Sequence, residues 1–169
     1  HDRGSFIKDI ISDNIMLGDI YMRAKELRVT ADVPRGVFVV RSLKKGESVP
    51  TDVIQSMFPD RQNDFVLSVG EGDVVLIRQM PEGAGIKELN KIASTVEESL
   101  RGGGASAVVG IGTIATHLRD LAKSYKEAQI AIEVGKVFDT EKYIINYENL
   151  GIGRLIYQLP TTLCEMFLQ

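Results

Sequence analysis

Residues 107–132 read AVVGIGTIATHLRDLAKSYKEAQIAI. The apolar run from Ala107 to Ile111 predicts a buried strand, and Gly110 and Gly112 lead from it toward a long helix that reaches about Phe138. Apolar side chains recur along that helix at spacings of three and four residues: Leu118, Leu121, Ala122, Tyr125, Ala128 and Ile132. A buried strand followed directly by an amphipathic helix is half of an α/β layer. The segment contains no evident catalytic grouping, which favours a domain that senses, assembles or transmits.

A hairpin is predicted upstream of this segment. Two apolar, β-branched runs, Asp64 to Val69 and Asp73 to Met80, are joined by Gly70-Glu71-Gly72, and glycines accept the positive φ angles of tight turns. Further patterns predict a strand at 36–43, a short helix at 51–58, a helix at 86–100 and a last strand at 143–147. Gly102-Gly103-Gly104 reads as a loop.

Helices are also predicted at both ends of the chain. Apolar stripes indicate helices at 6–15 and 19–27, hinged near Gly18, with Asp19 as a cap of the second. Another helix is expected at 150–159. The order of elements implies an α+β, ferredoxin-like sandwich with about five strands, whose helices cover at least one face of the sheet. Both ends read as cut from a longer chain.

The composition excludes several classes of function. The 169 residues carry a net charge of −3, so DNA binding through charge alone is not expected. A lone cysteine, Cys164, excludes a disulfide framework within the chain and reads as a small buried hydrophobe. No apolar run is long enough for a membrane span and no signal peptide opens the sequence, so we expect a cytoplasmic protein without membrane contact.

Several local motifs together resemble the GGDEF-like domain of bacterial transcription regulators of the purine-catabolism and carbohydrate-diacid type (the PucR and CdaR families). The motifs are Gly110-Ile111-Gly112 with the helix that follows, the entry from Ala24 through Pro34 into the first strand, and the exit Tyr147-Glu148-Asn149-Leu150-Gly151. The resemblance covers roughly residues 20 to 160. It implies linker helices at 1–33, a GGDEF-like domain at 34–148, and a helical connector at 149–169 that stops before a helix-turn-helix.

This resemblance implies a regulatory module rather than an enzyme. In such regulators an upstream region senses a small-molecule effector and a downstream helix-turn-helix binds DNA, so we expect DNA contact only through a domain absent from this sequence. We also expect a homodimer, because regulators of this kind bind symmetric sites. No cofactor is expected. The alternatives are a divergent nucleotide cyclase and a sensor domain with its own small-molecule pocket.

The cyclase alternative depends on the hairpin turn. Active GGDEF domains carry a Gly-Gly-Asp/Glu-Glu-Phe signature there, whereas this chain has Glu71-Gly72-Asp73-Val74-Val75. Only Gly72 and Asp73 match, and the first strand offers no acidic partner. Since two-metal phosphoryl transfer needs several convergent carboxylates, we expect no catalytic or metal-binding residues and interpret Asp73 as a turn residue.

Other candidate sites have structural explanations that we favour. Gly110 and Gly112 precede a helix, but without the third glycine of a dinucleotide fingerprint they indicate close packing of strand and helix backbones. His117 lacks a second histidine nearby and is expected at the surface or at the helix start. Ser124, Tyr125 and Lys126 are adjacent, so Tyr125 and Lys126 do not share a helix face as an oxidoreductase pair would.

Overall fold

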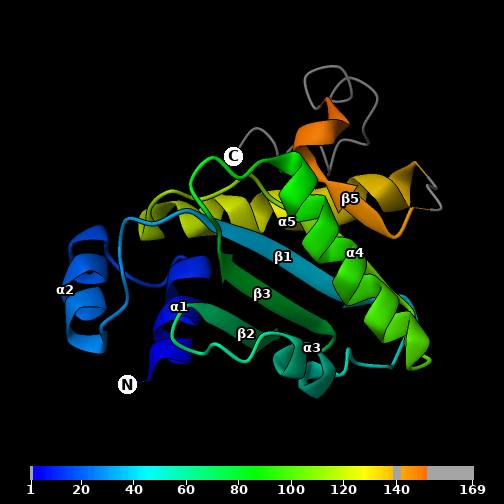
Figure 1. The fold of residues 1–169 in the computed structure, drawn as a ribbon, viewed down its shortest axis with the longest axis horizontal. Helices are drawn as coiled ribbons and strands as arrows, with labels where there is room; N and C mark the ends of the chain where they lie inside the picture. Colours follow the sequence, from blue (N-terminus) through cyan, green and yellow to red (C-terminus); the bar gives the residue numbers. More distant parts are fainter. Residues whose placement is uncertain (1, 139–141, 152–169) are drawn as a thin grey trace.

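The computed structural model describes residues 2–138 and 142–151 of the chain (Figure 1). A mixed sheet of five strands forms its centre, in the order β2-β3-β1-β4-β5. β1, β3, β2 and β4 pair in antiparallel fashion, and β4 pairs in parallel with β5. The strands are β1 (Arg35–Ser42), β2 (Asp64–Val69), β3 (Asp73–Gln79), β4 (Ala107–Ile111) and β5 (Ile144–Asn146). The predicted α+β sandwich with about five strands is confirmed.

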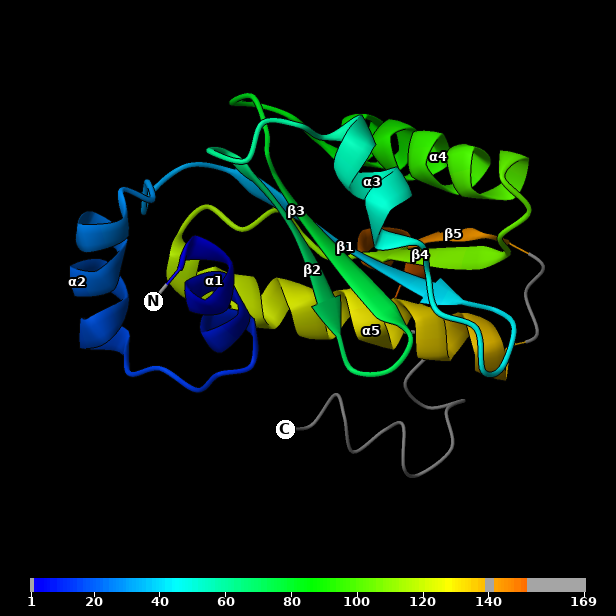
Figure 2. The same ribbon diagram turned by 90° about the horizontal axis from the view of Figure 1, so that it is seen from below.

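Helices cover both faces of this sheet, which exceeds the expectation of at least one (Figure 2). The helical elements are α1 (Arg3–Ile11), α2 (Leu17–Leu27), α3 (Thr51–Met57), α4 (Ile86–Gly102), η1 (Leu118–Asp120), α5 (Leu121–Val137) and η2 (Tyr147–Leu150). One face packs against α1 and α5, and the other against α3 and α4. Alternation along β1 sends Val37 and Val39 to the first face, and Phe38 and Val40 to the second.

The predicted bounds of the first helix and the predicted start of the second are wrong, whereas the second ends at Leu27 as predicted. α1 begins at Arg3 because the Asp2 carboxylate accepts a hydrogen bond from the Ser5 N–H at 2.6 Å, and it ends at Ile11, before Asp13 takes a left-handed φ of 59°. α2 begins at Leu17, so Asp19 lies within its first turn and does not cap it. The hinge is therefore the segment 12–16, which precedes Gly18.

The central elements agree closely with the patterns in the sequence. β2 has the predicted bounds, β3 ends one residue early, and Gly70 in the hairpin turn has the expected positive φ of 64°. The long helix differs at its start, because residues 112–117 lead into the short η1 before α5 begins. The predicted helix at 150–159 falls almost wholly outside the described residues.

The N-terminal helix α1 is part of the hydrophobic core. Phe6, Ile7, Ile10 and Ile11 are at most 4% exposed and join the cluster formed by α5 and the sheet. A domain boundary at residue 33 would therefore pass through this cluster. α2 lies at the edge of the domain (Figures 1 and 2): its Ile20 and Ala24 join the same cluster, whereas Leu17, Met22 and the preceding Met16 are more than half exposed. Within the described residues, no helix combines the length and apolar character needed to cross a membrane.

Candidate functional site: the hairpin end and its arginine

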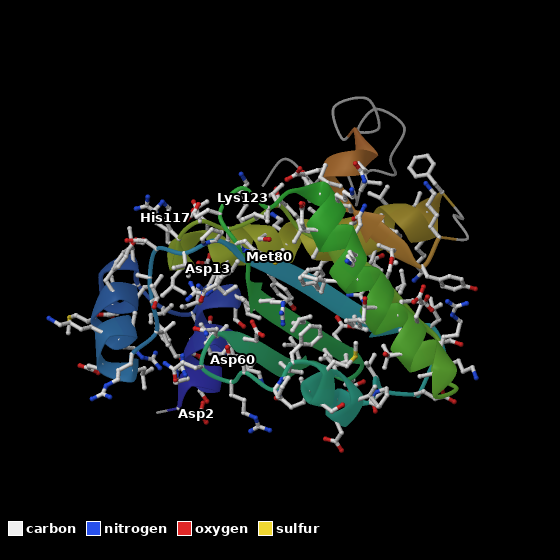
Figure 3. All side chains as sticks on the ribbon, in the orientation of Figure 1. Asp2, Asp13, Asp60, Met80, His117 and Lys123 are labelled. Atoms are coloured by element: carbon white, nitrogen blue, oxygen red, sulfur yellow. The ribbon has the colours of Figure 1, made fainter. Side chains whose placement is uncertain are left out.

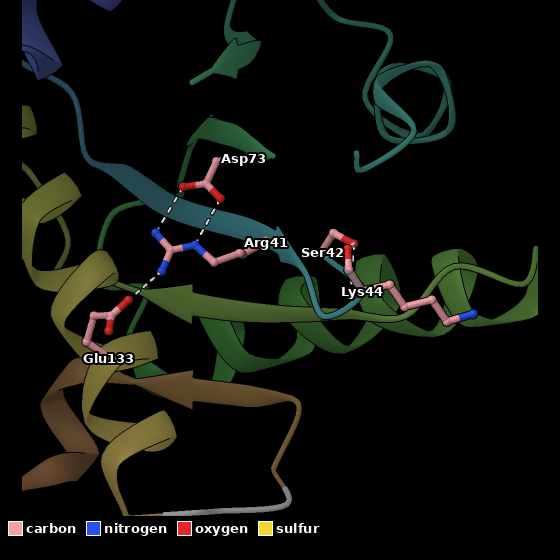
Figure 4. A network of polar contacts seen from close by, with 5 residues as sticks. All are labelled: Arg41, Ser42, Lys44, Asp73 and Glu133. Atoms are coloured by element: carbon pink, nitrogen blue, oxygen red, sulfur yellow. Dashed lines mark hydrogen bonds and ion pairs between the residues drawn. The ribbon is translucent and has the colours of Figure 1, made fainter. Parts of the chain in front are cut away.

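The hairpin between β2 and β3 places Asp73 at the first position of β3, directly opposite Arg41 near the end of β1. Alternation along the strand turns Arg41 toward the sheet face that α5 covers. The third partner, Glu133, lies near the end of α5. Three segments far apart in the sequence thus meet at one end of the sheet (Figure 4).

Arg41 joins these segments through three charge-assisted hydrogen bonds. Its Nε and Nη2 donate to the two carboxylate oxygens of Asp73 at 2.9 and 3.0 Å, and its Nη1 donates to Glu133 Oε1 at 2.8 Å (Figure 4). The side chains of Arg41 and Asp73 are 28% and 15% exposed, so both ions are partly removed from water. A bidentate pair of this kind has fixed geometry as well as favourable energy.

The electrostatics agree with this geometry. Hydrogen bonding to Asp73 is the largest cause that raises the pKa of the Arg41 guanidinium, and the charge of Glu133 adds to it. Nearby, burial raises the pKa of the Tyr125 hydroxyl, and the charge of Asp73 contributes. Arg41 therefore stays cationic and neutralises much of the charge of two carboxylates.

Our interpretation of Asp73 as a turn residue is therefore incomplete: its carboxylate is an ion-pair partner that fastens β3 to β1. The functional residue missed by the sequence argument is Arg41. Its signal was the cross-strand register, which sets Arg41 opposite Asp73 once the hairpin and first strand are aligned. The contribution of Glu133 depends on how α5 packs, which no local pattern reveals.

The glycines before α5 serve close packing, as predicted. A Cβ on Gly110 would lie 2.2 Å from the Ala128 carbonyl oxygen, and a Cβ on Gly112 would lie 2.1 Å from that of Ser124. Both contacts are with the backbone of α5, so no side-chain movement could relieve them. Gly102 is the last residue of α4, so the predicted loop begins one residue later, at Gly103, and Gly104 in it has a positive φ of 88°.

His117 lies at the helix start, at the opposite end of β1 from Arg41 (Figure 3). Its Nδ1 is 2.7 Å from the Asp32 carboxylate, and the two side chains are 37% and 63% exposed. Asp32 was not anticipated as its partner. Ser124, from the Ser-Tyr-Lys run, donates to the Thr113 carbonyl and so ties α5 to the loop before it.

Comparison with protein-family models decides the family. The model for the GGDEF-like domain matches residues 13–134, which include the hairpin, the Arg41 strand and the segment from β4 into α5. The chain belongs to the GGDEF-like domain family. No curated protein matches it significantly.

In this GGDEF-like domain, the hairpin residues do not fit the metal centre of an active cyclase. Asp73 is the one carboxylate at the matching turn position, and both of its oxygens accept hydrogen bonds from Arg41. Nowhere in residues 2–138 and 142–151 do three or more His, Cys, Asp or Glu side chains come together in a way that could hold a metal ion. The Arg41 guanidinium therefore already provides a cationic partner for both Asp73 oxygens.

Two cavities flank the arginine network of the GGDEF-like domain. One of about 280 Å³ is lined by Arg41, Ser42, Glu133 and Lys136, among others. A smaller one of about 160 Å³ lies against the hairpin turn and is lined by Ser48, Thr51, Ser68, Glu71 and Asp73. The smaller is far below the roughly 300–1,000 Å³ of typical small-molecule pockets, too little for a nucleoside triphosphate.

Proposed function

We propose that this GGDEF-like domain is a non-catalytic signalling module of a bacterial transcription regulator of the purine-catabolism or carbohydrate-diacid type. In this role it would couple an effector-sensing region upstream to a helix-turn-helix downstream. The observation that carries the proposal is the Arg41–Asp73 ion pair, since it commits the hairpin carboxylate to a structural cation. A hairpin so occupied holds β1, β3 and α5 together instead of binding a metal-bound nucleotide.

The position of α5 supports a transmitting role. This helix contacts α1 near the start of the chain, the sheet along its length, and η2 near the end of the described residues. Within α5, Glu133 pairs with Arg41, and the His117–Asp32 pair lies just before η1, which leads into α5. A displacement of α1 would therefore act directly on α5, which also packs against η2.

The absence of catalysis can be tested by incubating the protein with GTP and either Mg²⁺ or Mn²⁺ and separating the nucleotides by chromatography. We expect no cyclic dinucleotide and no loss of GTP. The matched variant is Asp73→Asn, which should give the same result as the unaltered protein in this assay, with no turnover of GTP. Metal-dependent turnover that Asp73→Asn abolishes would establish the domain as a cyclase and refute the proposal.

The regulatory role includes assembly as a homodimer, which sedimentation velocity can test over a range of concentrations. We expect concentration-dependent self-association, and the exposed apolar side chains of α2 provide surface for it. A sedimentation coefficient that stays that of a monomer at the highest concentration would contradict this part. A chain that includes the proposed helix-turn-helix should in addition bind a palindromic DNA site.

A further inference from the structure

Arg35, the first residue of β1, is buried beneath the N-terminal helices. The residue is 2% exposed, and alternation from Val37 places its side chain on the face of the sheet that α1 and α5 cover. Its Nη2 donates to the Thr30 carbonyl at 2.6 Å. Its Nε and Nη1 are buried and have no hydrogen-bond partner among the described residues.

A second guanidinium, that of Arg3, lies over Phe65 on the same face of the sheet. Arg3, at the start of α1, stacks 5.4 Å from the centre of the Phe65 ring and donates through its Nη atoms to the backbone of Arg61 and to Gln62. Its Nε is likewise buried without a partner. Arg3 also lines a groove of about 680 Å³ beside β2, which has both basic and acidic side chains in its lining: Arg28 and Arg61 as well as Asp2, Glu26 and Asp64.

The pair is anomalous because no carboxylate compensates Arg35 in the described part of the chain. The pKa of Arg35 is lowered to about 10, mainly by burial and in smaller part by the charge of Arg3. Other arginines of the domain have acidic partners: Arg23 pairs with Asp9, Arg41 with Asp73, and Arg78 with Asp64. A buried cation without a counter-charge is costly, and buried guanidinium N–H groups are normally paired.

We propose that Arg35 and Arg3 form a binding site for a small oxyanion, a phosphate or carboxylate group, between α1, the segment 28–34 and the start of β1. The planar N–H groups of a guanidinium suit both oxyanions, and two guanidinium groups together favour a doubly charged one. The anion would enter along the groove that Arg3 lines. This site is separate from the Arg41 network, and the proposal stands whether or not the domain serves a transcription regulator.

An anion bound there would change how the N-terminal segment is held. Arg35 already contacts Thr30, so the anion would add a bridge from the sheet, through Arg35, to α1, through Arg3. Binding would thus stabilise one placement of α1 and of the segment 28–34 relative to the sheet. The site therefore lies where an effector could alter the packing of the N-terminal helices.

The first test is thermal unfolding with inorganic phosphate or malonate, with sodium chloride added to keep ionic strength constant. We expect a saturable rise in the unfolding midpoint with at least one of the two, and the comparison shows whether the site prefers phosphate or carboxylate. Arg35→Met should weaken the response by roughly tenfold or more, as expected when charge-assisted hydrogen bonds are lost. The matched control is Arg23→Met, which removes a more exposed arginine from α2 and should leave the response unchanged.

A second measurement does not depend on a folded variant. In the unaltered protein, the Nε–H resonances of Arg35 and Arg3 should shift in NMR spectra on titration with the same anions, while that of Arg41 stays fixed. If neither anion gives a saturable response, or if Arg35→Met responds as the unaltered protein does, the site does not exist. In that case Arg35 is a structural residue whose N–H groups are hydrated.

Discussion

Arg41 illustrates how one side chain can determine what a site is able to do. Its guanidinium contacts two carboxylates from different elements and occupies both oxygens of Asp73. Because the ions are partly buried, removing the cation would leave two carboxylates facing each other in a poorly hydrated site. Such a loss costs more than that of an exposed surface pair.

We therefore expect Arg41→Met to lower the free energy of unfolding by about 1–3 kcal/mol, between the values typical of exposed and of buried pairs. The measurement is urea unfolding followed by circular dichroism, extended to a double-mutant cycle with Asp73→Asn. Arg23→Met, which breaks the more exposed Arg23–Asp9 pair, should cost less than Arg41→Met. Equal costs for the two variants would show that the Arg41 network adds no stability of its own.

The close contact between the β4 segment and α5 requires glycine at positions 110 and 112, because there is no room for a Cβ atom. The backbones approach so closely that any Cβ on Gly112 would overlap the Ser124 carbonyl oxygen. Interior packing is dense and transmits such an overlap as strain. This explains why residues 107–132 indicate the fold class so clearly: the glycines are required by the packing of the helix that follows.

Gly112→Ala should destabilise the domain by about 3 kcal/mol, near the upper end of the usual cost of overpacking, because backbone atoms cannot move aside. The matched control is Gly18→Ala in α2, where a Cβ would meet nothing within 4 Å. That change should stabilise the protein by about 0.5–1 kcal/mol through improved helix propensity. Denaturant midpoints of the two variants should therefore move in opposite directions, and a neutral Gly112→Ala would disprove the close approach.

The start of α4 has a pH-dependent contact. The Gly85 N–H donates to the Glu88 carboxylate at 2.8 Å, and this hydrogen bond lowers the pKa of Glu88 below its usual 4.5. Since the folded value is the lower one, the contribution to stability is present above pH 4.5 and is lost as the pH falls through the folded pKa.

Glu88→Gln should therefore flatten the pH dependence of stability between the ordinary pKa and the lowered one. The measurement is the urea midpoint at a series of pH values from neutral to acid. Glu98→Gln, an exposed change in the same helix, is the control and should retain the acid-induced loss that Glu88 causes. If Glu88→Gln and the unaltered protein lose stability in parallel, the hydrogen bond is not formed in solution.

Taken as a whole, the molecule has one sheet with helices on both faces. α1 is one of the helices that cover the first face. Removing residues 1–33 would uncover Val37, Val39, Phe65 and Ile77, which α1 and α5 bury together. Burial of Phe6, Ile7, Ile10 and Ile11 contributes about 6–12 kcal/mol, at about 1.5–3 kcal/mol for each side chain. This sum is comparable to the whole stability of a typical domain.

A chain that begins at Pro34 should consequently lose cooperative unfolding and bind a hydrophobic dye. Calorimetry of the shortened and unaltered chains, with dye fluorescence as a second readout, would show this. A chain that begins at Asp2 provides the control and should unfold as the unaltered protein does. A single sharp transition in the shortened chain, at an unchanged temperature, would support a domain boundary near residue 33.

Features that depend on contacts between neighbours in the sequence were easier to predict than features that depend on long-range contacts. The hairpin strands and the glycine packing were predicted well, because alternation and turn residues act between neighbours in the chain. The predicted start of α1 is wrong because the N-cap is Asp2, which lies outside the apolar stripe. The predicted start of α2 is wrong because its N-cap is Met16 and not Asp19. The roles of Arg41 and Arg35 could not be predicted from the sequence. Arg41 depends on partners from distant segments, and Arg35 is notable because two of its buried nitrogen atoms have no partner.

The ion pair at the hairpin also bears on how this domain can change over evolutionary time. Replacing Arg41 alone would leave Asp73 and Glu133 without this counter-charge, so a first substitution toward a metal centre would lower the stability of the fold. Binding a metal would also require further carboxylates at positions such as Val74, which is buried in the core. The intermediate sequences would be unstable before they gained any activity. Arg41 thus makes any route to a metal centre by single substitutions costly in stability.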